Sequence, residues 1–293
     1  MAETKVLGSS VDQSRRVPEE RHAAPGYEEQ FTAFIDFLGF SEVSKQADDT
    51  TRLKVLELLL SLSALRSEFD VQSEPNQGGG SRHQIRPAVS TFSDHIVVSY
   101  PLERIARDLG RPSDDVVVTF VVLNGFGRLL RSIAAAALRL GFLIRGGATI
   151  GKLYHSQGVV FGEAMTEAFE LESRVAIYPR VVLSPRVAGR QPWAAHKEIA
   201  VCNDGLHHFD YFKTLALGAV VPGSDYAEMS KAWFQDVIAV VARKLSDLQR
   251  DGKLKELAKW VWFSHEFRRG IETTPPELQA AFGLSLSDIP WSP

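Results

Sequence analysis

The chain has 293 residues, 44% of them hydrophobic, and its 33 basic and 36 acidic residues give a net charge of −3. This size is enough for one large core or two modest ones, and the near-neutral charge excludes a global field that attracts nucleic acid or an anionic membrane. The single cysteine, Cys202, excludes an intramolecular disulfide and a multi-cysteine zinc site, and it fits a reducing cytoplasm.

The apolar segments are too short to suggest membrane insertion. Residues 1–26 have no signal-peptide apolar region, and we expect them to form a disordered leader. The most apolar windows, 116–126 and 132–144, are separated by Arg128 and Arg131. Each falls short of the roughly 18–20 residues that a membrane span needs. The sequence therefore predicts a soluble, cytoplasmic protein without membrane or nucleic-acid partners.

The first regular elements follow the leader. The run FTAFIDFLGF at 31–40 is aromatic and aliphatic and predicts a buried strand that turns at Gly39. Leucines at helical spacing then predict a helix over 41–69. The polar, Gly-rich stretch 72–84 is expected to be a flexible loop.

The middle of the chain alternates between strand-like and helix-like composition. We expect a hairpin over 85–100 with its bend at Ser93-Asp94, a long buried helix over 115–141, two strands over 142–162, a helix over 163–176 and a strand over 178–184. This order of elements predicts an α+β or α/β sandwich with one face of its sheet covered by helices, and we favour the α+β class.

The pattern is looser after Pro185. An edge strand is expected over 207–217, and residues 226–271 are strongly helical, with an apolar stripe that includes Trp233 and Val240. This stripe either packs on its own domain or forms a dimer face.

Two aspartates interrupt apolar strands just before turns. Asp36 lies in the first strand and Asp94 at the tip of the hairpin. If the two strands lie side by side, the carboxylates meet, and a close carboxylate pair needs a compensating cation such as Mg²⁺ or Mn²⁺. The alternative is that each aspartate only stabilises its own turn.

Three motifs in the same order resemble those of the class III nucleotide cyclases. FIDFLGFSE resembles the family's opening strand, FSDHIVVS its metal-binding hairpin, and IRGGATIGKLYHSQGVVFGEAMTEAFELES its later strand and helix segment. The resemblance implies a ferredoxin-like sandwich with a mixed or antiparallel sheet as the catalytic domain at 27–185, followed by a mixed and mainly helical region at 186–293. It also implies a head-to-tail homodimer, with sites that lie between the two chains.

The resemblance further implies the chemistry of the site. Two divalent ions, Mn²⁺ or Mg²⁺, would be held by Asp36, Asp94 and the backbone carbonyl of Phe37, and would convert a nucleoside triphosphate to a 3′,5′-cyclic nucleotide and pyrophosphate. The turn that would hold the β- and γ-phosphates consists of Phe37, Leu38, Gly39, Phe40 and Ser41. Lys213 would reach a phosphate from a late strand.

The chain departs from the family at the positions that read the base and stabilise the transition state. Ser90 stands where the adenine-specifying lysine is expected, and Val159 where its acidic partner is expected. The transition-state asparagine and arginine are replaced by Thr166 and Glu170. Arg174, one helical turn further on, is the candidate substitute for the missing arginine.

These departures resemble the pyrimidine cyclases of the bacterial anti-phage system Pycsar. That likeness implies that UTP is converted to cyclic UMP, which acts on a separate cyclic-nucleotide-binding effector. Candidates for the base pocket are Tyr27, Arg86, Ser90 and Phe92. The alternatives are a cytidylate cyclase, a purine cyclase, and a degenerate fold that binds a nucleotide without turnover.

Overall fold

A computed structural model gives the arrangement of the elements. It describes residues 26–40, 48–64, 69–72, 82–212, 226–281 and 284–290. The strands are β1 (Glu28–Leu38), β2 (Phe69–Gln72), β3 (Arg82–Ile85), β4 (Ala88–Phe92), β5 (His95–Pro101), β6 (Leu143–Ser156), β7 (Val159–Phe161), β8 (Val181–Leu183), β9 (Ile199–Val201) and β10 (His207–Phe209). The helical elements are α2 (Asp49–Ala64), α3 (Leu102–Leu109), α4 (Val116–Arg139), α5 (Glu163–Glu170), the π-helical turn η1 (Leu171–Val175), α6 (Pro185–Ala188), η2 (Trp193–Ala195), α8 (Tyr226–Arg250), α9 (Leu254–Glu272), α10 (Pro276–Ala281) and η3 (Leu286–Asp288).

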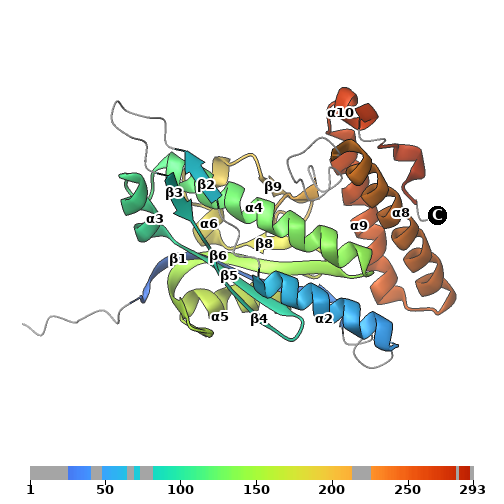
Figure 1. Cartoon of the computed structure of the whole chain (residues 1–293), viewed down its shortest axis with the longest axis horizontal. Helices are drawn as coiled ribbons and strands as arrows, with labels where there is room; N and C mark the ends of the chain where they lie inside the picture. The colour runs from blue at the N-terminus through green and yellow to red at the C-terminus, as the bar shows by residue number, and fades with distance from the viewer. Residues whose placement is uncertain are drawn as a thin grey trace, which may run out of the picture.

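The described residues form an eight-stranded sheet in the order β4-β5-β1-β6-β8-β10-β9, with β7 paired to β6, and a separate two-stranded sheet of β2 and β3 (Figure 1). The central strand β1 runs antiparallel to both β5 and β6, whereas β8 runs parallel to β6. Apart from the intervening β2, β3 and α3, the elements β1, α2, β4, β5, α4 and β6 occur along the chain in the order βαββαβ. The predicted α+β fold is confirmed.

The two faces of the sheet carry different side chains. Because successive residues of a strand point to opposite faces, Phe31 and Ile35 of β1 face one way and Phe34 and Asp36 the other. Phe31 and Ile35 belong to the main core cluster with α2 and α4, whereas Phe34 packs with Ala168 of α5. The helices α2 and α4 therefore cover the face that we call the core face, and Asp36 lies on the opposite face, under α5.

Helix α4 is the central helix of the core. Its N-cap is Asp115, whose side chain accepts a hydrogen bond from the backbone N–H of Val117 at 2.7 Å. The helix is continuous over 24 residues, so by length and composition alone it could cross a membrane, although neither sequence window was long enough. Instead, it packs on the core face through fully buried residues such as Phe126.

The C-terminal region adds an antiparallel helix pair, α8 and α9, beside α4 (Figure 1). The apolar stripe of α8 belongs to the main core, and the indole N–H of Trp233 donates to the carbonyl of Ala135 at 3.2 Å. Of the two alternatives for this stripe, packing on its own domain is the one observed.

Several predicted boundaries are wrong. Phe69, expected at the end of a helix, begins β2, and the expected loop over 72–84 contains ends of the paired strands β2 and β3. The helical stretch 226–271 is divided at Gly252, whose φ of +66° ends α8. The expected edge strand is β10, which lies between β8 and β9 because the short strand β9 forms the edge.

Candidate functional site

Asp36 and Asp94 are brought together by strand pairing. Asp36 lies opposite His95 in the β1–β5 ladder, and the backbone N–H of Phe37 donates to the carbonyl of Asp94 at 3.1 Å. One ligand atom from each of Asp36, Asp94 and His95 lies within 4.8 Å of the others. The predicted meeting of the two carboxylates is therefore observed at the end of β1.

His95 lies between the two aspartates, whereas its place in the sequence suggested only a polar surface group that flanks the site. Its Nε2 is 3.6 Å from Asp36 Oδ1 and its Nδ1 is 3.3 Å from Asp94 Oδ1. The imidazole packs against the rings of Phe34 and Phe92, with centroids 5.0 and 5.5 Å away. These ring contacts hold the imidazole beside both carboxylates.

Arg145 is the cation of the site, and sequence reasoning gave it no role. It lies opposite Asp36 in the β1–β6 ladder, and its Nε donates to Asp36 Oδ2 at 3.0 Å. The Nη2 of Arg145 lies 2.6 Å from Glu172 Oε1. The two side chains form an ion pair, but their geometry does not make a hydrogen bond. The only sequence signal was an arginine immediately before two glycines in a predicted strand.

Glu172 is almost fully buried behind Arg145. Burial raises the pKa of this carboxyl, the Arg145 guanidinium opposes the rise, and the nearby Asp36 charge adds to it. Glu172 comes from η1, and π-helical turns are frequent at functional sites. The sequence analysis placed this residue in an ordinary amphipathic helix and so missed it.

A glycine allows η1 to approach the sheet. A Cβ on Gly147 would lie 2.3 Å from the carbonyl oxygen of Ala168 and 2.4 Å from Leu171 Cβ. Any side chain at this position would push α5 and η1 away from β6. The absence of a side chain at Gly147 therefore lets η1 pack close enough to β6 for Glu172 to contact Arg145.

The remaining residues of the predicted phosphate turn are only partly described. The side chain of Phe37 is buried in the core, and Phe40 packs near Phe142, with ring centroids 6.0 Å apart. Gly39 has a φ of +94°, which L side chains rarely adopt, so the chain turns where the sequence predicted. Leu38 ends β1 and packs against the core, whereas Ser41 lies outside the described residues.

Ser90 takes part in a polar relay on the same sheet face. His155 Nε2 is 2.9 Å from Ser90 Oγ, and His155 Nδ1 is 2.9 Å from Ser99 Oγ. Burial lowers the pKa of His155 to about 4, so the ring is neutral at pH 7. Ser99 is fully buried, and its hydroxyl proton is satisfied if it donates to Nδ1. Nε2 then carries the ring proton and donates to Ser90, which leaves the Ser90 hydroxyl free to donate to a ligand.

Other predicted residues lie away from this cluster. Arg174 is exposed on η1, with its Nη1 3.7 Å from Glu170 Oε1. Thr166 is exposed on α5, and Arg86 is exposed just before β4. Within the described residues, Arg174 therefore does not join the Asp36 cluster of its own chain. Lys213 lies outside the described residues.

The cluster has the composition of a divalent-cation site. Asp36, Asp94 and Glu172 contribute three carboxyls against the guanidinium of Arg145 and the imidazole of His95. Oxygen ligands suit Mg²⁺ and Mn²⁺, and an imidazole suits transition metals. The donor set fits a metal ion, and the arrangement could neutralise and orient a phosphate-bearing ligand.

No protein-family model matches the chain, and no curated protein is a significant match. The residues and their geometry are therefore the basis for assigning a function.

Proposed function

We propose that the protein is a metal-dependent nucleotide cyclase that resembles class III cyclases and forms cyclic UMP from UTP. The observation that carries this proposal is the meeting of Asp36 and Asp94 at the end of β1, beside Arg145. Two carboxylates from separate elements can hold ions that activate the ribose 3′-OH and neutralise the triphosphate as pyrophosphate leaves.

The topology supports the same proposal. The βαββαβ sequence of elements and the strand order β4-β5-β1-β6 are those of a ferredoxin-like unit. In such a unit the end of the first strand and the tip of the middle hairpin are neighbours. This arrangement is the one expected for a class III cyclase domain, in which those two places carry the metal aspartates.

Each residue of the cluster has a chemical task in this proposal. Asp36, Asp94 and the Phe37 carbonyl would hold the two ions, and His95 would favour Mn²⁺ over Mg²⁺ because imidazole suits transition metals. Arg145 holds Asp36 in place and adds positive charge near the phosphates. Glu172 fixes Arg145 from behind. These positions are set before substrate binds, so little reorganisation is needed.

The Ser90 relay supports uracil as the preferred base. If Nε2 of His155 donates to Ser90, the tautomer in which the buried Ser99 hydroxyl donates to Nδ1, then the Ser90 hydroxyl keeps its own proton for a ligand. A donor matches a carbonyl such as O4 of uracil and opposes the exocyclic amine of cytosine. Ser90→Ala is expected to lower kcat/KM for UTP more than for CTP, as measured by product formation, whereas an equal loss for both would remove Ser90 as the discriminating group.

A homodimer would complete the site. Half-exposed aromatic rings, Phe92 and Phe169, flank Phe34 next to the cluster. Apolar surface of this kind beside a polar site suits a second copy of the chain. The second copy would then supply the base pocket and a transition-state cation. Arg174 of one copy remains the candidate for that cation.

A nucleotide-binding fold without turnover is the second candidate. Its supporting observation is that Arg174 is exposed and pairs with Glu170 rather than with the cluster. Binding of UTP with Mn²⁺ but no release of pyrophosphate would favour it.

The test is to incubate the purified full chain with UTP, CTP, ATP or GTP and Mn²⁺ and to identify the products by mass spectrometry. We expect cyclic UMP from the wild type and from Asp108→Asn, which changes an exposed aspartate on α3. Asp36→Asn and Asp94→Asn should give none. Undiminished cyclic UMP formation by either variant would contradict the proposal, and a preference for ATP or GTP would indicate a purine cyclase.

In the cell, the proposed product would act as a second messenger in anti-phage defence. A cytoplasmic enzyme of this kind needs a separate effector that binds the cyclic nucleotide. Infection of cells that carry the gene with and without Asp36→Asn would test this role by the level of cyclic UMP.

A further inference from the structure

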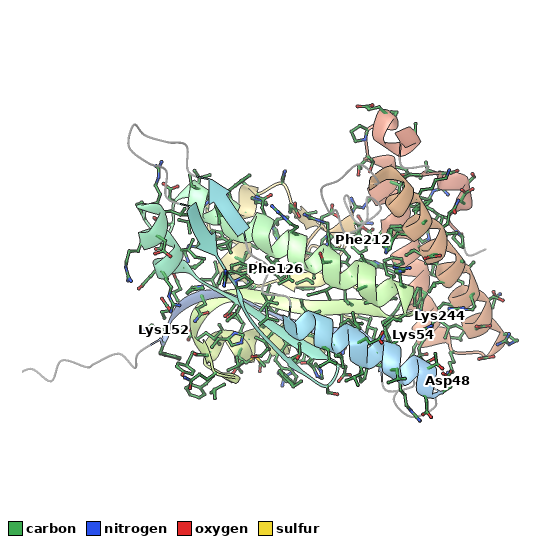
Figure 2. All side chains as sticks on the ribbon, viewed as in Figure 1. Asp48, Lys54, Phe126, Lys152, Phe212 and Lys244 are labelled. Carbon is green, nitrogen blue, oxygen red and sulfur yellow. The ribbon has the colours of Figure 1, made fainter. Side chains whose placement is uncertain are left out.

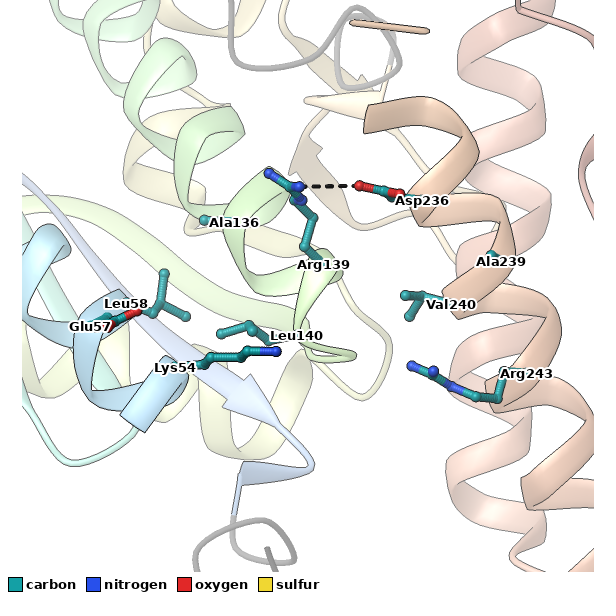
Figure 3. A pocket seen from close by; sticks show the side chains of 10 residues that line it. All are labelled: Lys54, Glu57, Leu58, Ala136, Arg139, Leu140, Asp236, Ala239, Val240 and Arg243. Atoms are coloured by element: carbon teal, nitrogen blue, oxygen red, sulfur yellow. Dashed lines mark hydrogen bonds and ion pairs between the residues drawn. The ribbon is translucent and has the colours of Figure 1, made fainter. Parts of the chain in front are cut away.

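A cavity lies between α2, α4 and α8, on the core side of the sheet, and no residue of the Asp36 cluster lines it (Figure 3). Its volume is about 900 Å³. The floor is apolar and includes Leu58, Leu140 and Val240. The volume is within the range of small-molecule sites, roughly 300–1,000 Å³.

Three cations from three different helices converge on this cavity: Lys54 of α2, Arg139 of α4 and Arg243 of α8 (Figure 3). Figure 2 shows where Lys54 lies on α2 in the whole molecule. Arg139 pairs with Asp236 at 3.1 Å. With the described residues, Lys54 and Arg243 form no hydrogen bond or ion pair, and in Figure 3 their charged ends point toward each other across the space.

Two carboxylates, Glu57 and Asp236, also line the cavity, so three cations face two anions and one positive charge is left over. Helix α4 ends at the cavity with Leu140 as its C-cap, and a helix C-terminus is equivalent to about half an elementary negative charge. In Figure 3, Glu57 lies on the side of α2 away from Arg139 and Arg243. Lys54 and Arg243 form no ion pair with the described residues, so their mutual repulsion costs free energy, and a bound anion lowers that cost.

We propose that the cavity binds an organic phosphate, a dianion that carries a small apolar group. The guanidinium of Arg243 matches two phosphate oxygens, and the ammonium of Lys54 supplies a second charge. The apolar group packs on Leu58, Leu140 and Val240. Since α2 and α8 come from opposite ends of the chain, the ligand fastens the C-terminal helix pair to the core. This inference does not depend on the proposed cyclase activity.

The test uses phenyl phosphate as the probe and isothermal titration calorimetry on the full chain in metal-free buffer. Lys54→Gln with Arg243→Gln in one variant is expected to weaken binding at least about 10-fold, which corresponds to about 1.4 kcal/mol. The matched control is Arg107→Gln, which changes an exposed arginine on α3 and should leave binding unchanged. Equal affinity of the double variant and the wild type would overturn the proposal.

Two further measurements test whether the probe binds in this cavity. Arg145→Gln removes the cation of the Asp36 cluster, so loss of phenyl phosphate binding in that variant would place the probe there and overturn the proposal. Thermal unfolding should show that phenyl phosphate raises the Tm of the wild type but not of the double variant, while phenol raises neither. A Tm of the ligand-free double variant within a few degrees of wild type shows that it is folded.

Discussion

The two faces of the sheet differ in what their side chains do, although β1 contributes to both. On the core face, Phe31 and Ile35 are buried against α2 and α4 with other apolar residues. On the opposite face, Asp36 meets Arg145 and the half-exposed rings Phe92 and Phe169 lie near it. The period-2 alternation of one strand thus separates the residues that stabilise the fold from those proposed to carry chemistry.

Because the two faces differ in this way, mutations on one face should affect stability and mutations on the other should affect the proposed activity. Substitutions on the core face should change the free energy of unfolding and affect turnover only through folding. Those on the opposite face should change turnover or its pH dependence with smaller effects on stability.

The largest expected effect comes from the core face. Phe126 is fully buried, with ring centroids 5.1 Å from both Phe31 and Phe209. Phe126→Ala leaves a cavity and should lower the free energy of unfolding by about 3–5 kcal/mol, measured by urea denaturation. Phe120→Ala, on the exposed side of the same helix, is the control and should cost far less. Equal costs for the two variants would contradict the assignment of the core face.

An intermediate effect is expected at Glu172. Glu172→Gln keeps the shape of the side chain but removes the charge that fixes Arg145. We expect kcat to fall by about 10–100-fold, the usual effect of losing a residue that orients a metal ligand. Glu256→Gln changes an exposed carboxyl on α9, away from the cluster, and should not alter kcat. Unchanged turnover in Glu172→Gln would show that this buried carboxyl only stabilises the fold.

The smallest effect concerns pH. Burial lowers the pKa of His155 from 6.5 to about 4. As the pH falls from about 6.5 to about 4, the unfolded chain takes up a proton that the folded chain excludes, so stability falls in this window. In urea denaturation at a series of pH values, His155→Gln should reduce the change in the free energy of unfolding per pH unit. The contribution of His208 to that change should remain, because burial also lowers the pKa of His208 to about 4. His207→Gln is the control, and a slope that is identical in all three proteins would contradict the prediction.

The sequence predicted those features that local patterns encode. The aromatic run around Asp36 predicted β1, the Ser93-Asp94 bend predicted the hairpin, and the long apolar stretch predicted α4. The proximity of Asp36 and Asp94 was predictable because Asp36 lies near the end of β1 and Asp94 lies in the turn just before β5, the strand that pairs with β1.

The features that were missed depend on long-range register. Arg145 meets Asp36 only because β6 pairs with β1, and no local pattern gives that pairing. Glu172 points at Arg145 because a π-helical turn and the absence of a side chain at Gly147 let η1 approach the sheet. Most of β3 was predicted to be loop, because Arg82, His83 and Gln84 are polar and follow a Gly-rich stretch.

The most direct test of the central claim is Mn²⁺ binding followed by electron paramagnetic resonance, with the wild type, Asp36→Asn, Asp94→Asn and Asp108→Asn. The account predicts that the wild type and Asp108→Asn bind Mn²⁺ with the same affinity and that each of the other two variants loses at least about 10-fold, or about 1.4 kcal/mol. Unchanged Mn²⁺ affinity in both Asp36→Asn and Asp94→Asn would contradict the claim that these two aspartates form one metal site.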